Sequence, residues 1–377
     1  MLSFYLKPTN FCNIDCEHCY LPEETRANKS VMNDETLAAT ARLAVDLAKR
    51  EMHESVHFIW HGGEPLVLSP KFYWHAQEVL KAAMGDFPFS QSLQTSLIPY
   101  REEWSDLIAQ VFNYHIGSSV DFTQRQVKSS SEAYLDLWMQ KVELARSHGH
   151  FVHPGMVPTR HEVSKAAAIY GWFVEHGFKA FNVERFSQFG TKTIDWPTNS
   201  EHARFLIGLF DCVVGDLKSR GEAPAINVVM GGINGILRGL PGDRWGTRCQ
   251  REFLVVEPDG SLNTCPDRAR HEAPYSNSHD GVDAFIVSPE RRKWIRINDV
   301  THKESHCHTC EFNHFCRSGC PVTPNGPSNG QKECSGYKSY LLHVKRYTEE
   351  NPDQIPLLLQ YIDMQASGID MSLPSHE

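Results

Sequence analysis

The sequence predicts an α/β fold: a partial or closed (β/α)6 barrel of the TIM type, followed by a small cysteine-rich domain. From residue 1 to about 190, short β-rich runs alternate with amphipathic helical stretches, which is the pattern of parallel strands joined by crossover helices. After that point the alternation stops. Seven of the 11 cysteines then fall between Cys249 and Cys334, in a segment with little periodicity. Such a segment buries little apolar area, so we expect bonds to another group to hold it.

The elements of the barrel follow from local pattern. Strands are expected at Ser3–Lys7, Val56–Trp60, Ser92–Leu97, His115–Val120, Phe151–Val157 and Ala180–Arg185. Helices are expected at Asp34–Arg50, Lys71–Met84, Glu102–Val111, Ser131–Ser147 and Val163–His176. The first of these helices has one apolar face, formed by Leu37, Ala41, Ala44, Leu47 and Ala48.

The rest of the chain has a different pattern of predicted secondary structure. A helix over Glu201–Arg220 leads into the Gly-rich stretch Met230–Gly246, and Phe253–Glu257 and Leu262–Thr264 then predict a small hairpin. We therefore expect four parts: the barrel at 1–195, a linking helix and bridging region at 196–245, the cysteine-rich domain at 246–340 and a helical tail at 341–377.

Composition excludes several classes of protein. A net charge of -9 disfavours a general nucleic-acid binder, because phosphate contacts need a basic surface. No apolar run approaches the length of a membrane span, and the first ten residues carry no export signal. A disulfide framework suits a short secreted chain, whereas tightly spaced cysteines in a long chain without an export signal favour metal binding. We expect a protein of a reducing compartment, the cytoplasm, that binds neither nucleic acid nor membrane.

The first cysteine group follows the first strand directly. Cys12, Cys16 and Cys19 lie on one short loop, at the strand end where α/β proteins form their sites. Three thiolates can bind three corners of a [4Fe–4S] cube and leave the fourth iron open to a ligand. A structural zinc site with His18 as fourth ligand is the alternative on spacing alone.

This loop resembles the signature of the radical S-adenosylmethionine (SAM) superfamily, Cys-x3-Cys-x2-Cys followed by an aromatic residue, here Tyr20. Gly62-Gly63-Glu64-Pro65, at the end of the second strand, resembles a second element of that family. The resemblance implies that the open iron binds the amino and carboxyl groups of SAM and that an electron from the cluster yields a 5′-deoxyadenosyl radical. It also implies that Tyr20 lies beside the adenine, that Gly62 and Gly63 let the backbone approach SAM closely, and that Glu64 accepts from the SAM ammonium.

Further site residues are expected at later strand ends. Ser119-Val120-Asp121 is similar to a Ser-x-Asp of related enzymes near the ribose and substrate, although Phe122 stands where many relatives have Gly. Gln94-Thr95-Ser96 and Asn182 are candidate contacts to SAM or substrate. The candidate catalytic residues are Asp121, Glu184 and Arg185, and His153 could also face the barrel mouth.

The later cysteines resemble the SPASM domain, an extension with auxiliary clusters found in peptide-modifying radical SAM enzymes. The resemblance assigns Cys307, Cys310, Cys316 and Cys334 to a distal auxiliary [4Fe–4S] cluster, and Cys249, Cys265 and Cys320 to a proximal one. This gives three clusters in all. Some relatives have an eighth cysteine that is missing here, so the proximal cluster is open or takes Cys212, Asp243 or a substrate group. A zinc ribbon of Cys307, Cys310, Cys316 and Cys320 is the alternative.

The resemblance implies modification of a peptide side chain. The segments Lys7–Cys12 and Cys19–Pro22 are most similar to maturases of ribosomally made peptides of the glycine-rich-repeat group, which form cyclophanes at a β-carbon. The expected partners are a precursor peptide or protein and a reductant such as flavodoxin or ferredoxin. The alternatives are formylglycine formation as in sulfatase maturases, a small-molecule radical SAM enzyme, and a non-catalytic zinc or cluster scaffold.

Overall fold

A computed structural model describes residues 1–17, 19–127, 129–187, 189, 196–242, 245–323, 326–329 and 334–363. The chain divides into two units by its internal contacts. The first unit comprises Met1–Val152, Phe189–Lys192 and Arg248–Ile295, and the second comprises His153–Gln188, Thr193–Thr247 and Arg296–Glu377. No helix of the described residues is long and apolar enough to cross a membrane.

A mostly parallel sheet forms the centre of the first unit. Among its described residues, the strands pair in the order β12-β11-β10-β1-β3-β4-β5. Their bounds are β1 Leu2–Leu6, β3 Val56–Trp60, β4 Phe89–Thr95, β5 His115–Ser119, β10 Phe253–Val256, β11 Ser261–Asn263 and β12 Ser276–Asn277. The first four predicted strands and the predicted hairpin of β10 and β11 are confirmed. The sequence did not predict that β10 pairs in parallel with β1, so that a late segment extends the sheet.

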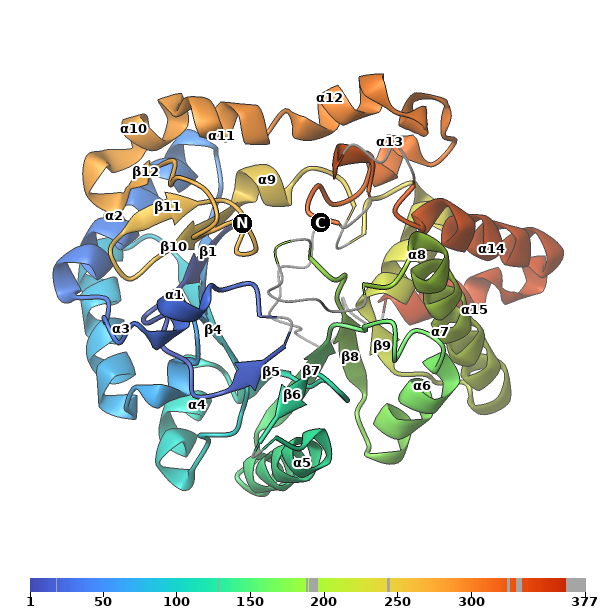
Figure 1. Cartoon of the computed structure of the whole chain (residues 1–377), viewed down its shortest axis with the longest axis horizontal. Helices are drawn as coiled ribbons and strands as arrows, with labels where there is room; N and C mark the ends of the chain where they lie inside the picture. Colours follow the sequence, from blue (N-terminus) through green and yellow to red (C-terminus); the bar gives the residue numbers. More distant parts are fainter. Residues whose placement is uncertain are drawn as a thin grey trace. The chain divides into compact units, whose positions relative to one another are not determined.

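Helices cover this sheet. They are α1 Glu23–Ala27, α2 Asp34–Arg50, α3 Pro70–Met84, α4 Ser105–Val111, α5 Ser131–Ser147, α9 Cys249–Glu252, α10 Gly281–Val287 and α11 Pro289–Trp294, with short 3-10 turns η1 Pro65–Val67, η2 Glu102–Trp104 and η3 Ser278–Asp280. Helix α2 packs on α3, β1 and β3, and α10 lies beside it (Figure 1). The predicted apolar face of α2 is buried. The side chain of Asn33 caps this helix by accepting from Thr36 N at 2.8 Å.

A two-residue ladder joins two loops of the first unit. Strand β2 (Asp15–Cys16) lies within the cysteine loop, and β6 (Arg125–Gln126) follows the end of β5. They pair antiparallel, with Cys16 opposite Arg125. Such short strands carry no periodicity, so this pairing could not be predicted from the sequence.

The second unit contains a smaller parallel sheet, in which β8 (Ala180–Val183) pairs with Gly155 and Met156 of β7 (Phe151–Met156) and with β9 (Ala225–Ile226). Its helices are α6 Ala166–Glu175, α7 Asn199–Arg220, α8 Asn227–Arg238, α12 Ile297–Glu304, α13 Asn313–Cys316, α14 Tyr337–Glu350 and α15 Ile355–Asp363, with 3-10 turns η4 His306–Thr309, η5 Pro327–Asn329 and η6 Pro352–Gln354. Both remaining predicted strands are confirmed.

The Gly-rich stretch is partly helical, because α8 extends into it. A Cβ on Gly232 would lie 2.5 Å from the Tyr340 hydroxyl, and one on Gly235 would lie 2.6 Å from the Phe315 ring. These glycines let the helix approach two buried aromatic rings closely. Close packing therefore outweighs the low helix propensity of glycine.

The cysteine-rich segment also contains more helix than its weak periodicity indicates. Helices α10, α11 and α12 follow one another from residue 281 to residue 304. Each is only two or so turns long, which is too short for a clear apolar repeat. The expected division at residues 195, 245 and 340 remains a prediction.

Candidate active site

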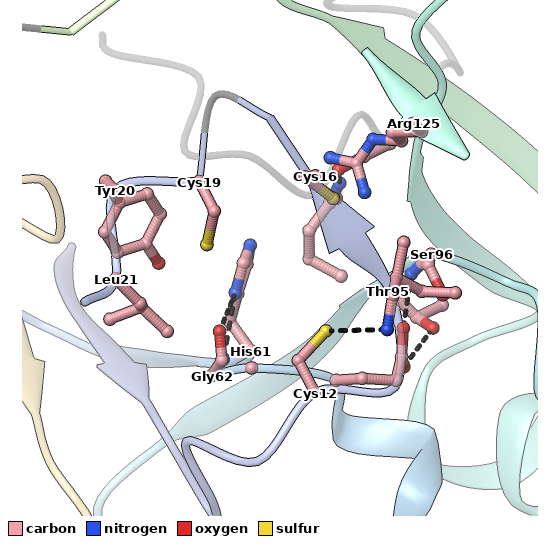
Figure 2. Close-up of a pocket in the computed structure, with 15 residues that line it drawn as sticks. Cys12, Cys16, Cys19, Tyr20, Leu21, His61, Gly62, Thr95, Ser96 and Arg125 are labelled. Carbon is pink, nitrogen blue, oxygen red and sulfur yellow. Dashed lines mark hydrogen bonds between the residues drawn. The ribbon is translucent and has the colours of Figure 1, made fainter. Parts of the chain in front are cut away.

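Cys12, Cys16 and Cys19 line one pocket of the first unit, as the sequence predicted (Figure 2). Cys12 is held near α1 because its backbone N–H donates to Arg26 O at 3.2 Å. Cys16 is held by the β2–β6 ladder. His18, the fourth ligand of the zinc alternative, lies outside the described residues.

Burial makes the thiols of Cys12 and Cys16 poor acids in the protein alone. It raises the pKa of Cys12 to about 12, with a further contribution from the Glu64 charge. It raises the pKa of Cys16 to about 11. A buried group of thiols needs a cationic centre to ionise, and a metal site supplies one. The donor set therefore fits an iron–sulfur cluster.

Gly62 and Gly63 lie against the backbone of the cysteine loop. Gly63 N donates to Thr9 O at 3.0 Å, and Glu64 N donates to Phe11 O at 2.9 Å. A Cβ on Gly62 would lie 2.2 Å from Thr9 O, and a Cβ on Gly63 would lie at the same distance from Asn10 O. The two glycines are therefore required for close contact between two protein segments. This is a constraint additional to any approach of a ligand.

Glu64 presents a buried carboxylate to the pocket. Its side chain is 1% exposed, and Oε1 accepts from Leu66 N at 2.9 Å and from the Thr95 hydroxyl. Oε2 accepts from Ser96 N at 2.8 Å. None of the ion pairs among the described residues involves Glu64. A buried carboxylate without a cationic partner is costly, so this site suits a cationic ligand group.

Tyr20 and Ser119 line the same pocket, together with Gln94, Thr95 and Ser96. The Lys7 ammonium lies 5.3 Å from the centre of the Tyr20 ring. Gln94 Nε2 donates to the Ser119 hydroxyl at 3.1 Å. The structure thus brings together the residues predicted at the ends of the first four strands, apart from Asp121.

Two polar lining residues, His61 and Arg125, were not predicted. Burial lowers the pKa of His61 to about 3, so its imidazole is neutral. The Arg125 guanidinium lies beside Cys16 (Figure 2). His61 directly precedes Gly62, which was an available signal for it. No sequence signal indicated Arg125, because its position depends on the short ladder between β6 and β2.

Asp121 has a different environment from the one expected of a catalytic acid or base. It is 2% exposed and is not among the residues that line the described part of the pocket. Its Oδ2 accepts from Arg125 Nε at 2.7 Å. The carboxylate therefore orients Arg125, and its predicted catalytic role remains a prediction.

Asn182, Glu184 and Arg185 lie in the second unit. Asn182 is buried in β8, and Glu184 N donates to Met156 O at 2.8 Å. Arg185 donates through one terminal nitrogen to Asn199 Oδ1 at 2.9 Å, and burial lowers its pKa. Their predicted contacts with SAM or substrate remain predictions, as does a place for His153 at the barrel mouth.

A second pocket, within the second unit, is lined by Cys307, Cys310, Cys316 and Cys334, the set assigned to the distal cluster. Burial and the neighbouring thiols raise the pKa of Cys316. The turn between Cys316 and Cys320 is left-handed at Arg317, Ser318 and Gly319. Asn298 Nδ2 stabilises this turn by donating hydrogen bonds to the carbonyl oxygens of Arg317 and Gly319.

The proximal cysteines divide between the units. Cys249 and Cys265 belong to the first unit and Cys320 to the second, so their assignment to one cluster remains a prediction. Asp243, a candidate further ligand, lies outside the described residues. Cys212 is half-buried on α7.

Comparison with known proteins finds a family match for residues 6–164 and relatives over most of the chain. Residues 6–164 match the sequence model of the Radical SAM superfamily. The chain is 25% identical to the serine-type anaerobic sulfatase-maturating enzyme of Klebsiella aerogenes, over 88% of this chain and 82% of that protein. It is 21% identical to the enzyme of the same name from Bacteroides thetaiotaomicron, over 90% and 88% respectively.

Solved structures share the fold. One is native anSMEcpe with bound AdoMet and Cp18Cys peptide, with a TM-score of 0.75 at 20% identity, over 96% of this chain and 99% of that one. Another is Streptococcus suis SuiB bound to precursor peptide SuiA, with a TM-score of 0.60 at 14% identity, over 87% and 74%. The predicted α/β fold class with its cysteine-rich C-terminal region is confirmed. Residues 6–164 thus form a radical SAM domain, and the chain is an enzyme.

Proposed function

We propose that this enzyme modifies a side chain of a peptide or protein at its β-carbon, by use of SAM and a [4Fe–4S] cluster on Cys12, Cys16 and Cys19. When bound, the cluster and SAM supply the 5′-deoxyadenosyl radical that removes the hydrogen atom. The observation that supports this most is the pocket itself, which is lined by the three cysteines and by Glu64, whose carboxylate accepts three hydrogen bonds but forms no ion pair with any described residue.

The residues of the pocket have distinct roles in this proposal. The cysteines bind three irons, and Glu64 accepts from the ammonium of SAM. Tyr20 contacts the adenine, and Ser119 contacts the ribose through its hydroxyl. Gly62 and Gly63 keep Glu64 against the cysteine loop by permitting the backbone contacts described above.

We further propose two auxiliary clusters, which bring the total to three. Cys307, Cys310, Cys316 and Cys334 line one pocket, which supports the distal cluster. The proximal cluster would use Cys249, Cys265 and Cys320.

Formylglycine formation is the reaction that the relatives favour. The curated relatives named as sulfatase-maturating enzymes match nearly nine-tenths of the chain. Oxidation of a serine to formylglycine removes two hydrogens, one as an atom and one as a proton and an electron. The same oxidation of a cysteine gives a thioaldehyde, which water then converts to formylglycine with release of hydrogen sulfide. The auxiliary clusters would accept that electron and return it to the cytoplasmic reductant, a flavodoxin or ferredoxin.

Cyclophane formation is the second candidate and remains a prediction. The fold is similar to that of SuiB, whose structure was solved with a precursor peptide, and this similarity supports a ribosomal peptide as an alternative substrate. The missing eighth auxiliary cysteine also separates this chain from the sulfatase-maturase pattern.

Substrate profiling tests the proposal. The reconstituted enzyme would be incubated with SAM, dithionite and either a sulfatase-derived peptide containing serine or cysteine, or a precursor peptide rich in aromatic residues. Formylglycine in the first peptide supports the favoured reaction, and a crosslink in the second supports the alternative. If neither peptide increased the yield of 5′-deoxyadenosine above that of the enzyme without peptide, the result would contradict peptide modification.

A further inference from the structure

The cysteine loop is joined to the loop after β5 by backbone hydrogen bonds. Cys16 pairs with Arg125 in the β2–β6 ladder, and Glu17 N donates to Gln124 O at 3.1 Å. Gln126 Nε2 also donates to Glu17 Oε1 at 3.1 Å. The position of Arg125 relative to Cys16 is therefore set by the backbone.

The Arg125 side chain carries a fixed charge at this position. It is 13% exposed, lines the pocket and lies beside Cys16 (Figure 2). A guanidinium stays protonated at any pH at which the protein is folded. Its Nε donates to Asp121 Oδ2 at 2.7 Å, and this carboxylate is 2% exposed. The largely buried positive charge of Arg125 and the buried negative charge of Asp121 therefore have defined positions beside Cys16.

We propose that Arg125, oriented by Asp121, is a positioning residue that raises the reduction potential of the cluster on Cys12, Cys16 and Cys19. The proposal rests on the function proposed above, because it needs that cluster. One-electron reduction adds a negative charge to the cluster. A nearby positive charge stabilises the reduced state more than the oxidised state, and burial reduces the screening by water.

Asp121 has the opposite electrostatic effect. Its negative charge destabilises the reduced cluster and offsets part of the effect of Arg125. Arg125 is the nearer of the two to the pocket, because it lines the pocket and Asp121 does not. The pair therefore favours the electron transfer that precedes SAM cleavage, and Asp121 limits the size of that effect.

Charge variants separate this role from a purely structural one. Arg125→Gln removes the positive charge, Arg125→Lys keeps it, and Asp121→Asn removes the negative charge while its side-chain oxygen can still accept from Arg125. The readout is an EPR-monitored redox titration of the reconstituted full-length enzyme without SAM. The signal of this cluster is the one that is lost in a Cys12/Cys16/Cys19→Ala variant.

We expect Arg125→Gln to shift the midpoint potential to a lower value, Asp121→Asn to shift it to a higher value, and Arg125→Lys to stay near the wild type. A structural role would not produce shifts of opposite sign. An unchanged potential in Arg125→Gln, or shifts of the same sign in both charge-removing variants, would overturn the proposal. If Arg125→Gln fails to load iron, Asp121→Asn decides alone: a higher potential supports the proposal, and an equal or lower one overturns it.

Failure of the proposed function is a separate result. In that case the wild type and the Cys12/Cys16/Cys19→Ala variant would contain the same amount of iron and give the same EPR signals. Iron analysis before the titration therefore distinguishes the two failures.

Discussion

The Lys7 ammonium donates to Glu257 Oε1 at 2.7 Å, with both side chains at most 1% exposed. The pair joins the end of β1 to the end of β10, two strands that pair in parallel although 250 residues separate these partners in the chain. Asn10 and Arg270 donate to the other carboxylate oxygen, at 2.7 and 2.9 Å. Lys7 also contacts the ring of Tyr20. A buried ion pair therefore connects the base of the cysteine loop to the hairpin of β10 and β11.

Removal of Lys7 should destabilise the first unit. Lys7→Met leaves the Glu257 carboxylate buried with Asn10 and Arg270 as its remaining donors. Loss of one partner of a buried ion pair costs about 3–5 kcal/mol, and the remaining donors place the expected loss at the lower end of that range. Urea unfolding monitored by tryptophan fluorescence measures it. A double variant with Glu257→Gln should recover part of the loss, and no recovery would contradict the pairwise account.

Glu64→Gln should weaken SAM binding and leave the iron in place. A hydrogen bond to a charged group contributes about 1.5–3 kcal/mol, so we expect roughly 10- to 100-fold weaker binding. Equilibrium binding of SAM to the reconstituted enzyme, with iron counted in parallel, measures both quantities. The control is Glu54→Gln, an exposed carboxylate ahead of β3. Equal SAM affinity in Glu64→Gln and wild type would contradict the proposed role of Glu64.

Gly63→Ala should impair cluster assembly. The new Cβ would lie 2.2 Å from Asn10 O and 2.3 Å from Phe11 O, so the cysteine loop must move. We expect reduced iron content after reconstitution, together with a lower unfolding midpoint. Gly171→Ala in α6 is the matched control, because its Cβ would meet no atom within 4 Å and alanine favours helix. Full iron loading by Gly63→Ala would show that this contact is not needed.

Cys316→Ser should remove one auxiliary cluster. We expect about four fewer irons per chain, on the stoichiometry of a [4Fe–4S] cluster, with the SAM cluster retained. Cys212→Ser is the control and should retain all its iron if this half-buried α7 residue packs without binding metal. Loss of iron in Cys212→Ser would instead make Cys212 a ligand, as the missing eighth cysteine allows.

Much of the fold could be predicted because its strands and helices have strong local patterns. Helix α2 has the bounds that its apolar repeat indicates. The parallel pairing of β1 with β10 could not be predicted, because a contact between such distant segments leaves no local trace in one sequence. The helix over the Gly-rich stretch was missed for a related reason. Gly232 and Gly235 pack on Tyr340 and Phe315, which come much later in the chain.

The same distinction between local motifs and long-range contacts applies to the residues of the site. Cys12, Cys16, Cys19, Tyr20 and Glu64 carry short motifs, and the structure places them around one pocket. Arg125 belongs to no motif and reaches the pocket through a two-residue ladder. The sequence also suggested that Gly62 and Gly63 allow the backbone to approach the ligand. The structure shows that they pack against the backbone of residues 9–11.

The most direct test of the account is SAM cleavage by the reconstituted enzyme. The wild type, Glu64→Gln and a Cys12/Cys16/Cys19→Ala variant would be reconstituted without oxygen and treated with SAM and dithionite, with 5′-deoxyadenosine measured by mass spectrometry. We predict about twelve irons per chain and deoxyadenosine for the wild type, a lower rate of deoxyadenosine formation for Glu64→Gln, and none for the cysteine variant. Zinc in place of iron in the wild type, with SAM left intact, would contradict the account.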